Sequence, residues 1–227
     1  MSLKEINQKK DVPIYTFGTI NFKDLECIVT IKRNISTEIF SDWFEADIQL
    51  NQNDQAFFDN LIEENYFLIE SYNEEELKVK FLAPILNRVK FTDVAHEIRD
   101  FYEAKLTYKT DKFILTGTTD FLVAKGLEYS KKPYFFIQEF KKSIKNDDPR
   151  PQLLAELISA IELNNFKTMK GAFIIGENWN FVILEKLDNN KYQYFISHTL
   201  NATHTNHLQQ IYKNLVFVKH EIIEMSD

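Results

Sequence analysis

Glycine, proline and cysteine are scarce in this chain of 227 residues, with five, five and one respectively. So few glycines and prolines exclude collagen-like segments and low-complexity linkers. The single cysteine, Cys27, cannot form an internal disulfide, and no cysteine-rich zinc cluster is possible. A chain without disulfides suits a reducing compartment, so we expect a cytoplasmic protein.

Long apolar runs are also missing. No stretch of about 18 apolar residues is present, so we expect no membrane helix. The first ten residues carry charges without an apolar stretch behind them, which argues against a secretory signal.

Acidic residues outnumber basic ones by 34 to 27, giving a net charge of −7. This balance argues against a strong general nucleic-acid binder. A local exception lies between residues 125 and 150, where lysine and arginine gather. An ordinary solvated loop would explain these charges equally well.

Twenty phenylalanines and ten tyrosines supply material for a core. Residues 15–20 and 26–33 predict short strands. Apolar residues at helical spacing predict a helix within 51–71. A second helix is expected from residue 74, with Asn73 and Glu76 forming a capping box and Pro84 introducing a kink.

From residue 101 the pattern favours strands. Residues 101–110 and 112–124 predict a hairpin, and the apolar run in 134–142 predicts a strand buried on both faces. A helix then starts near Pro149 or Pro151. Three strands at 170–176, 180–187 and 192–197 and a final helix at 203–218 complete the prediction. Without a visible linker, we treat residues 1–70 as an elaboration of one domain whose core spans 71–227.

The strongest chemical signal joins two of these strands. Gly117-Thr118-Thr119-Asp120 is followed, after eighteen residues, by Glu139-Phe140-Lys141. Residues two apart in a strand share a face, so Glu139 and Lys141 project together, and Asp120 lies on the preceding strand. Two carboxylates on adjacent strands can hold Mg²⁺ or Mn²⁺, and a lysine beside them can act on an attacking water.

Context, and not the Glu-x-Lys pattern alone, carries this signal, because the pattern occurs three times. The copy at Glu76 lies in an expected helix, where residues two apart do not share a face. The copy at Glu103 has no aspartate on a strand before it. The structural alternative for Asp120 is a hairpin-ending aspartate, and for Glu139 and Lys141 an exposed ion pair.

The segments GTTDFLVA, PYFFIQEFKKS and PQLLAEL together resemble the PD-(D/E)XK superfamily of restriction-endonuclease-like nucleases, most closely its RecB-like branches. The resemblance covers roughly residues 74–186. It implies an α/β fold in which a mixed central sheet is flanked by helices, here with an N-terminal β/α elaboration. Two positions depart from the pattern: Thr119 stands where the motif has proline, and Glu156 where RecB-like enzymes tend to carry tyrosine.

The resemblance also implies roles. Asp120 and Glu139 would be metal ligands, joined by the main-chain carbonyl of Phe140 and by an acid on the first core helix. Glu76 is the best match for that acid, with Glu75 as the alternative. Lys141 would be the catalytic lysine, and Gln152 would assist from the following helix.

The expected function is therefore Mg²⁺-dependent hydrolysis of phosphodiester bonds, with DNA as the expected substrate and a homodimer as a common arrangement of similar nucleases. A module of the same fold that binds nucleic acid or protein without catalysis is the alternative. The residues expected to contact phosphates are Lys131, Lys132, Lys142, Lys145 and Arg150.

Overall fold

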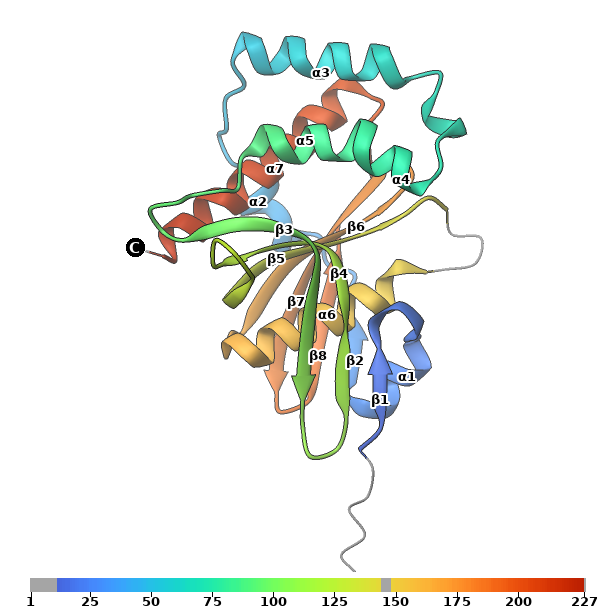
Figure 1. The fold of residues 1–227 in the computed structure, drawn as a ribbon, viewed down its shortest axis with the longest axis vertical. Helices are drawn as coiled ribbons and strands as arrows, with labels where there is room; N and C mark the ends of the chain where they lie inside the picture. Colours follow the sequence, from blue (N-terminus) through green and yellow to red (C-terminus); the bar gives the residue numbers. More distant parts are fainter. Residues whose placement is uncertain (1–11, 144–147, 227) are drawn as a thin grey trace, which may run out of the picture.

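The computed structural model describes residues 12–143 and 148–226, and a curled mixed sheet forms its centre (Figure 1). The strand order is β1-β4-β5-β6-β7-β8-β2, with β3 paired to β4 and β9 paired to β7. The strands are β1 (Ile14–Thr16), β2 (Thr30–Arg33), β3 (Ile98–Lys109), β4 (Ile114–Lys125), β5 (Lys131–Lys141), β6 (Thr168–Ile175), β7 (Asn178–Asp188), β8 (Lys191–Ile196) and β9 (Leu200–Asn201). The expected α/β class with a mixed sheet flanked by helices is confirmed.

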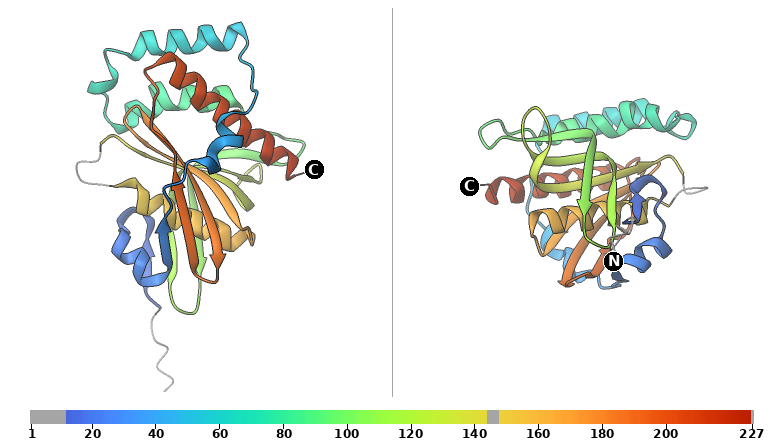
Figure 2. Two further views of the ribbon diagram at one scale, coloured as in Figure 1. Left: turned by 180° about the vertical axis from the view of Figure 1, so that it is seen from behind. Right: turned by 60° about the horizontal axis from the view of Figure 1, so that its bottom comes forward.

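Helices cover both faces of the sheet (Figures 1 and 2). They are α1 (Phe22–Ile28), α2 (Ser41–Phe44), α3 (Gln52–Asn65), α4 (Glu74–Leu77), α5 (Ala83–Val89), α6 (Pro149–Asn164) and α7 (Thr205–Glu224). One face carries α2, α3, α4, α5 and α7, and the other carries α1 and α6. No helix in residues 12–143 and 148–226 combines the length and apolarity that a membrane span requires.

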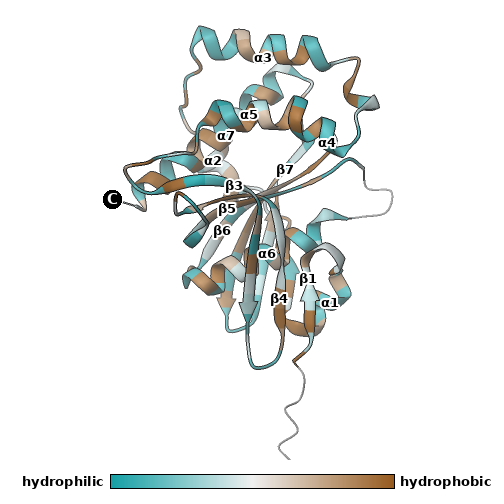
Figure 3. Ribbon diagram, viewed as in Figure 1, coloured by the Kyte–Doolittle hydropathy of each residue, from teal (hydrophilic) through white to brown (hydrophobic). Residues whose placement is uncertain are grey.

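Each face of the sheet has its own core. Along β5, Phe136 and Phe140 pack into the cluster under α5 and α7, whereas Ile137 packs into the cluster against α6. This alternation is the period of two expected of a strand. It confirms that β5 is buried on both faces. Figure 3 shows hydrophobic residues along the inner strands of the sheet.

The N-terminal segment adds a strand to the sheet at two separate places. β1 pairs in parallel with residues 114–116 of β4, and β2 pairs in parallel with β8. The prediction of a strand over 26–33 was correct only for Thr30–Arg33, because Asn21 and Asp24 form a capping box that starts helix α1 instead. Likewise only the first two residues of the expected 15–20 strand lie in β1, because Phe17–Thr19 form a 3₁₀ turn.

The helical stretch after Asn73 begins as expected, with Asn73 and Glu76 forming a reciprocal capping box. The irregularity that follows is a π-helical turn at Lys78–Leu82. Pro84, where a kink was expected, follows this turn as the second residue of α5, within one continuous helical stretch. The last helix extends to Glu224, six residues beyond the predicted end.

Candidate functional site

The neighbouring strands β4 and β5 separate at the point where the motif lies. Their pairing runs from Lys125↔Lys131 to Phe121↔Gln138 and then stops. On the same side of β4, pairing resumes only at Thr116, with β1. Asp120 therefore stands in a gap between two partners, and its Oδ2 accepts a hydrogen bond of 2.8 Å from the main-chain N–H of Phe140. The side chain takes the place of the missing strand partner.

Gly117, the first residue of the motif, has a packing role. A Cβ at this position would lie 2.7 Å from Cδ2 of Phe17, which is completely buried. The phenylalanine that follows β1 can thus lie directly on β4 only because residue 117 has no side chain. The glycine allows the N-terminal segment to close the sheet beside Asp120.

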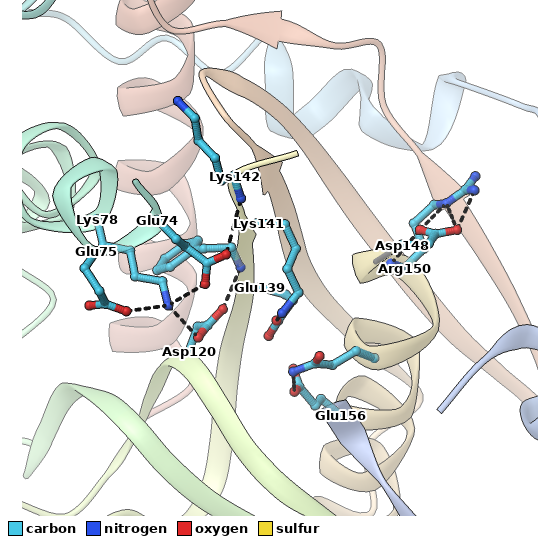
Figure 4. Close-up of polar contacts among 12 residues, drawn as sticks. Glu74, Glu75, Lys78, Asp120, Glu139, Lys141, Lys142, Asp148, Arg150 and Glu156 are labelled. Carbon is cyan, nitrogen blue, oxygen red and sulfur yellow. Dashed lines mark hydrogen bonds and ion pairs between the residues drawn. The ribbon is translucent and has the colours of Figure 1, made fainter. Parts of the chain in front are cut away.

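Glu139 and Lys141 project from β5 toward the α6 face, together with Ile137 and opposite to Phe140. Asp120 lies at the fork between the strands, where it contacts Lys78, and its charge acts on the Glu139 carboxyl. The Nζ of Lys141 is 3.0 Å from Oε1 of Glu139. The three expected residues Asp120, Glu139 and Lys141 thus meet at the strand fork: Asp120 comes from the side of Lys78, and Glu139 and Lys141 point toward Glu156 (Figure 4).

Burial dominates the electrostatics of Glu139. Its side chain is 0% exposed, and apart from the ion pair with Lys141 neither carboxylate oxygen has a hydrogen-bond partner among the described residues. Burial, and then the charge of Asp120, raise the pKa of Glu139 to about 9, against the opposing effect of Lys141. The attraction of Lys141 does not offset the free-energy cost of removing water from the Glu139 carboxylate, which also faces the negative charge of Asp120.

For Lys141, burial favours the neutral amine, but the carboxylates of Glu139 and Asp120 outweigh it and raise the pKa of Lys141. That direction presupposes charge on Glu139, whereas the raised pKa of Glu139 favours a proton there. We give more weight to burial for Glu139, because its carboxyl has no exposed surface while 17% of the Lys141 side chain reaches solvent.

Helix α6 contributes two polar side chains to the interior near the triad. Gln152 is 8% exposed, and its Nε2 donates to Oε1 of Glu156 at 3.2 Å. Glu156 is fully buried, and its Oε2 has no partner among the described residues. Burial, and then the charge of Glu139, raise the pKa of Glu156 well above its ordinary value. Gln152 thus holds Glu156 on the same side of the sheet as Glu139 (Figure 4).

The acid brought to Asp120 from the first helices is Glu74, and not Glu76. The Nζ of Lys78 lies 3.1 Å from Oδ1 of Asp120 and 3.2 Å from Oε1 of Glu74, and 3.8 Å from Glu75 (Figure 4). Glu76 instead caps its own helix and pairs with Lys80 at 3.3 Å on the surface. A carboxylate at the third helical position turns back to the N-cap N–H and so points away from the sheet.

Lys78 was not singled out from the sequence, although its spacing of four from Glu74 places the two on one helix face. Burial works against its charge, but Asp120 and Glu74 outweigh burial and raise the pKa of Lys78. It is therefore a permanent cation bound to Asp120 from the face opposite α6.

Glu103 is a second residue that the sequence interpretation set aside. The hairpin register pairs Tyr102 with Phe121 and Ala104 with Thr119, so Glu103 stands directly across from Asp120. Its φ of 52° is unusual for a residue with a side chain. Burial and the charge of Asp120 raise the pKa of Glu103. Counting residue pairs back from the Thr110–Asp111 turn of the predicted hairpin would have placed Glu103 opposite Asp120.

The expected phosphate contacts do not form one basic surface beside the triad. Lys131 and Lys132 begin β5 and Lys141 ends it, so about 30 Å of strand separates them. Lys142 donates from Nζ to the carbonyl of Ile69 at 2.7 Å. Arg150 makes a two-pronged pair with Asp148 at 2.8 and 2.7 Å, and Lys145 lies outside the described residues.

The donor set of the fork fits a divalent cation. Each carboxylate oxygen has two acceptor positions, so Asp120 keeps free ones beside its bonds to Lys78 and Phe140, and Glu139 keeps free ones beside its ion pair with Lys141. Within the described ranges, no group of three or more histidine, cysteine, aspartate or glutamate side chains is arranged to hold a metal ion. Two carboxylates still suit Mg²⁺, which usually keeps several waters and needs few protein ligands.

Comparison with known proteins adds no relative. No family model matches the chain, and no curated protein matches it. The likeness to the PD-(D/E)XK nucleases consequently depends on the motif and on the geometry around it.

Proposed function

We propose that this protein is a divalent-metal-dependent nuclease with a restriction-endonuclease-like core. The observation that carries the proposal is the fork itself. Asp120, Glu139 and Lys141 come from two strands that separate at this point, where Lys141 pairs with Glu139 and the charge of Asp120 acts on Glu139. Two acids and a lysine gathered in a sheet interior cost free energy unless they serve a ligand, because buried charges lose their hydration.

The order of elements supports the same proposal. Helix α5, hairpin β3–β4, strand β5, helix α6 and strand β6 follow one another, and β6 lies parallel to β5. The resemblance implies a mixed central sheet flanked by helices, and these elements form one, with the motif residues on β4 and β5. The N-terminal strands β1 and β2 extend that sheet.

Asp120 and Glu139 would hold the cation, here Mg²⁺ or Mn²⁺. Bound there, it would supply a water of lowered pKa and neutralise charge on the phosphate. Glu103 and Glu74 lie close enough to Asp120 to join its electrostatic environment. The carbonyl of Phe140 stays a proposed additional ligand.

Lys141 has the position to orient the attacking water and to stabilise negative charge that develops on the phosphate. The neighbouring carboxyl groups raise the pKa of Lys141, Glu139 most and then Asp120, and a cation that displaces the proton of Glu139 would leave that carboxylate beside the lysine. Gln152 and Glu156 would keep the Glu139 side of the site in place from α6. Lys78 pairs with Asp120 Oδ1 and also with Glu74. If Asp120 bound the metal ion instead, Glu74 would still hold the Lys78 ammonium group beside the site.

The experiment is cleavage of labelled single-stranded and duplex DNA and RNA with Mg²⁺ or Mn²⁺. We expect Asp120→Asn and Lys141→Ala to lower the cleavage rate a hundredfold or more, which is the usual effect of losing such a group. Asp111→Asn and Lys109→Ala, which change the same residue types at the tip of the β3–β4 hairpin, should cleave normally. Equal rates for all five proteins, or no cleavage of any substrate, would refute the proposal.

One observation favours a second candidate, a binding module without catalysis. Each acid of the fork already has a cationic partner, since Lys78 pairs with Asp120 and Lys141 with Glu139. Calorimetric titration with Mn²⁺ distinguishes the two. A nuclease should bind Mn²⁺ and lose that binding in Asp120→Asn, whereas a retired site should not bind it.

A further inference from the structure

An exposed apolar turn follows helix α3 on the side of the molecule where β5 ends. The side chains of this turn are exposed: Tyr66 by 55%, Phe67 by 86% and Leu68 by 51%. The rings of Tyr66 and Phe67 pack edge to face, with 5.2 Å between their centroids. Most large apolar side chains of this size are buried, so three consecutive exposed ones need an explanation. The turn is visible as a hydrophobic segment beyond α3 in Figure 3. We call these three residues the aromatic shelf.

A cavity of about 340 Å³ lies against the shelf. Tyr66 and Phe67 form one wall, and Glu177 and Asn201, from the β6–β7 turn and β9, form another. Glu70 and Thr203 add further polar groups to the lining. Its size is at the lower end of the range typical of small-ligand pockets.

The cavity adjoins the candidate site. Ile69, in its wall, accepts a hydrogen bond of 2.7 Å from Nζ of Lys142, the residue after Lys141. On the other side, the N–H of Gly176 donates to the carbonyl of Lys141 at 2.8 Å, and Glu177 follows it. The shelf cavity is therefore linked to the end of β5 on two sides, by the Lys142 side chain and by the segment from Gly176 to Glu177.

The chemistry of the lining selects what can enter. Glu70 and Glu177 are acidic and, among the residues that the structure describes, no lysine or arginine lines the cavity, so a phosphate would be repelled. A nucleobase offers what the lining matches: a flat ring face for Tyr66 and Phe67, and amino groups that carboxylate and amide oxygens can accept from. A nucleobase can stack on these rings and donate to these oxygens only where it is not paired with another base.

From this continuity, and resting on the nuclease function proposed above, we infer that the aromatic shelf binds an unpaired base of the substrate strand next to the phosphate held at the fork. The substrate class is single-stranded nucleic acid, or a strand end that is not paired. A second protein chain is a poorer fit, because three side chains offer far less than the roughly 800 Å² per partner of a stable interface. The strand would thus pass from the fork across Lys142 to the shelf.

The test is binding of a 5′-labelled 20-nucleotide single strand and of the matching blunt duplex by fluorescence anisotropy in EDTA, which prevents cleavage. We expect the wild type to prefer the single strand. Phe67→Ala should weaken single-strand binding about tenfold, the usual effect of losing one stacking ring, and Phe67→Trp should restore it. Tyr129→Ala is the matched control, since Tyr129 is 63% exposed at the far end of β5 and should leave binding unchanged.

The possible failures can be told apart. Suppose that the wild type cleaves with Mg²⁺. If Phe67→Ala then binds the single strand as tightly as the wild type, or loses equal affinity for the single strand and the duplex, this inference is overturned and the nuclease proposal stands. A dimer that dissociates in Phe67→Ala with unchanged binding would mark the shelf as a protein interface and also overturn it. A wild type that neither binds nor cleaves any nucleic acid would end both.

Discussion

The substitution Glu139→Gln should stabilise the protein while abolishing its proposed activity. The pKa of Glu139 is raised to about 9 by burial and by Asp120, compared with an ordinary value of 4.5. The folded protein therefore keeps a proton on this carboxyl at neutral pH, whereas the unfolded chain releases it. The amide of glutamine has the shape of the protonated acid and has no proton to lose.

The magnitude follows from linkage. A raised carboxyl pKa gives stability that is fully present below about pH 4.5 and is lost as pH rises toward 9, at about 1.4 kcal/mol per unit. Two and a half units separate 4.5 from pH 7, so the cost there reaches about 3 kcal/mol. The pKa of about 9 already contains the opposing effect of Lys141, and we therefore expect Glu139→Gln to gain about 3 kcal/mol at pH 7. In a chain of this length, each kcal/mol raises Tm by about 2–4 °C.

Urea denaturation at pH 5, 7 and 8.5 measures this effect. The difference between Glu139→Gln and the wild type should be small at pH 5 and should grow with pH, while Glu128→Gln, on an exposed turn, should follow the wild type. Glu156, which is also buried, should keep part of the pH dependence in the variant. A variant that is less stable than the wild type at pH 8.5, or that has the same pH slope, would refute the reasoning and show that Lys141 keeps Glu139 ionised.

Two further substitutions test the frame of the site by the same urea measurement. Glu103→Gly should raise the free energy of unfolding by about 1 kcal/mol, because glycine accepts a φ of 52° without strain; an equal gain from Glu103→Gln would assign the effect to charge beside Asp120 instead. Gly171→Ala should lower it by about 1–3 kcal/mol, because the new Cβ would lie 2.9 Å from the carbonyl oxygen of Ile137 and 3.1 Å from Leu157. Gly18→Ala, with nothing within 4 Å, is its control, and a similar small change in both would contradict the close packing of α6 on β5 and β6.

The local elements could be predicted from the sequence where one short-range signal dominates. The turn at Thr110–Asp111, the apolar run that became β5 and the prolines at the start of α6 each act over a few residues, and the corresponding elements are present. The common face of Glu139 and Lys141 follows from the period of two in a strand, and it is present as well.

The sequence by itself determined which residue types could gather at the fork, because the spacing within β4 and β5 and the hairpin between β3 and β4 are local properties. Only the tertiary structure decided how far the strands stay paired, which acid faces Asp120 and which lysines lie near it. Glu74 replaces Glu76, Lys78 joins from a helix on the opposite face, and Lys131 lies a full strand length away. These outcomes depend on strand register and on how a helix is rotated over the sheet, and both are set by packing between segments distant in the chain.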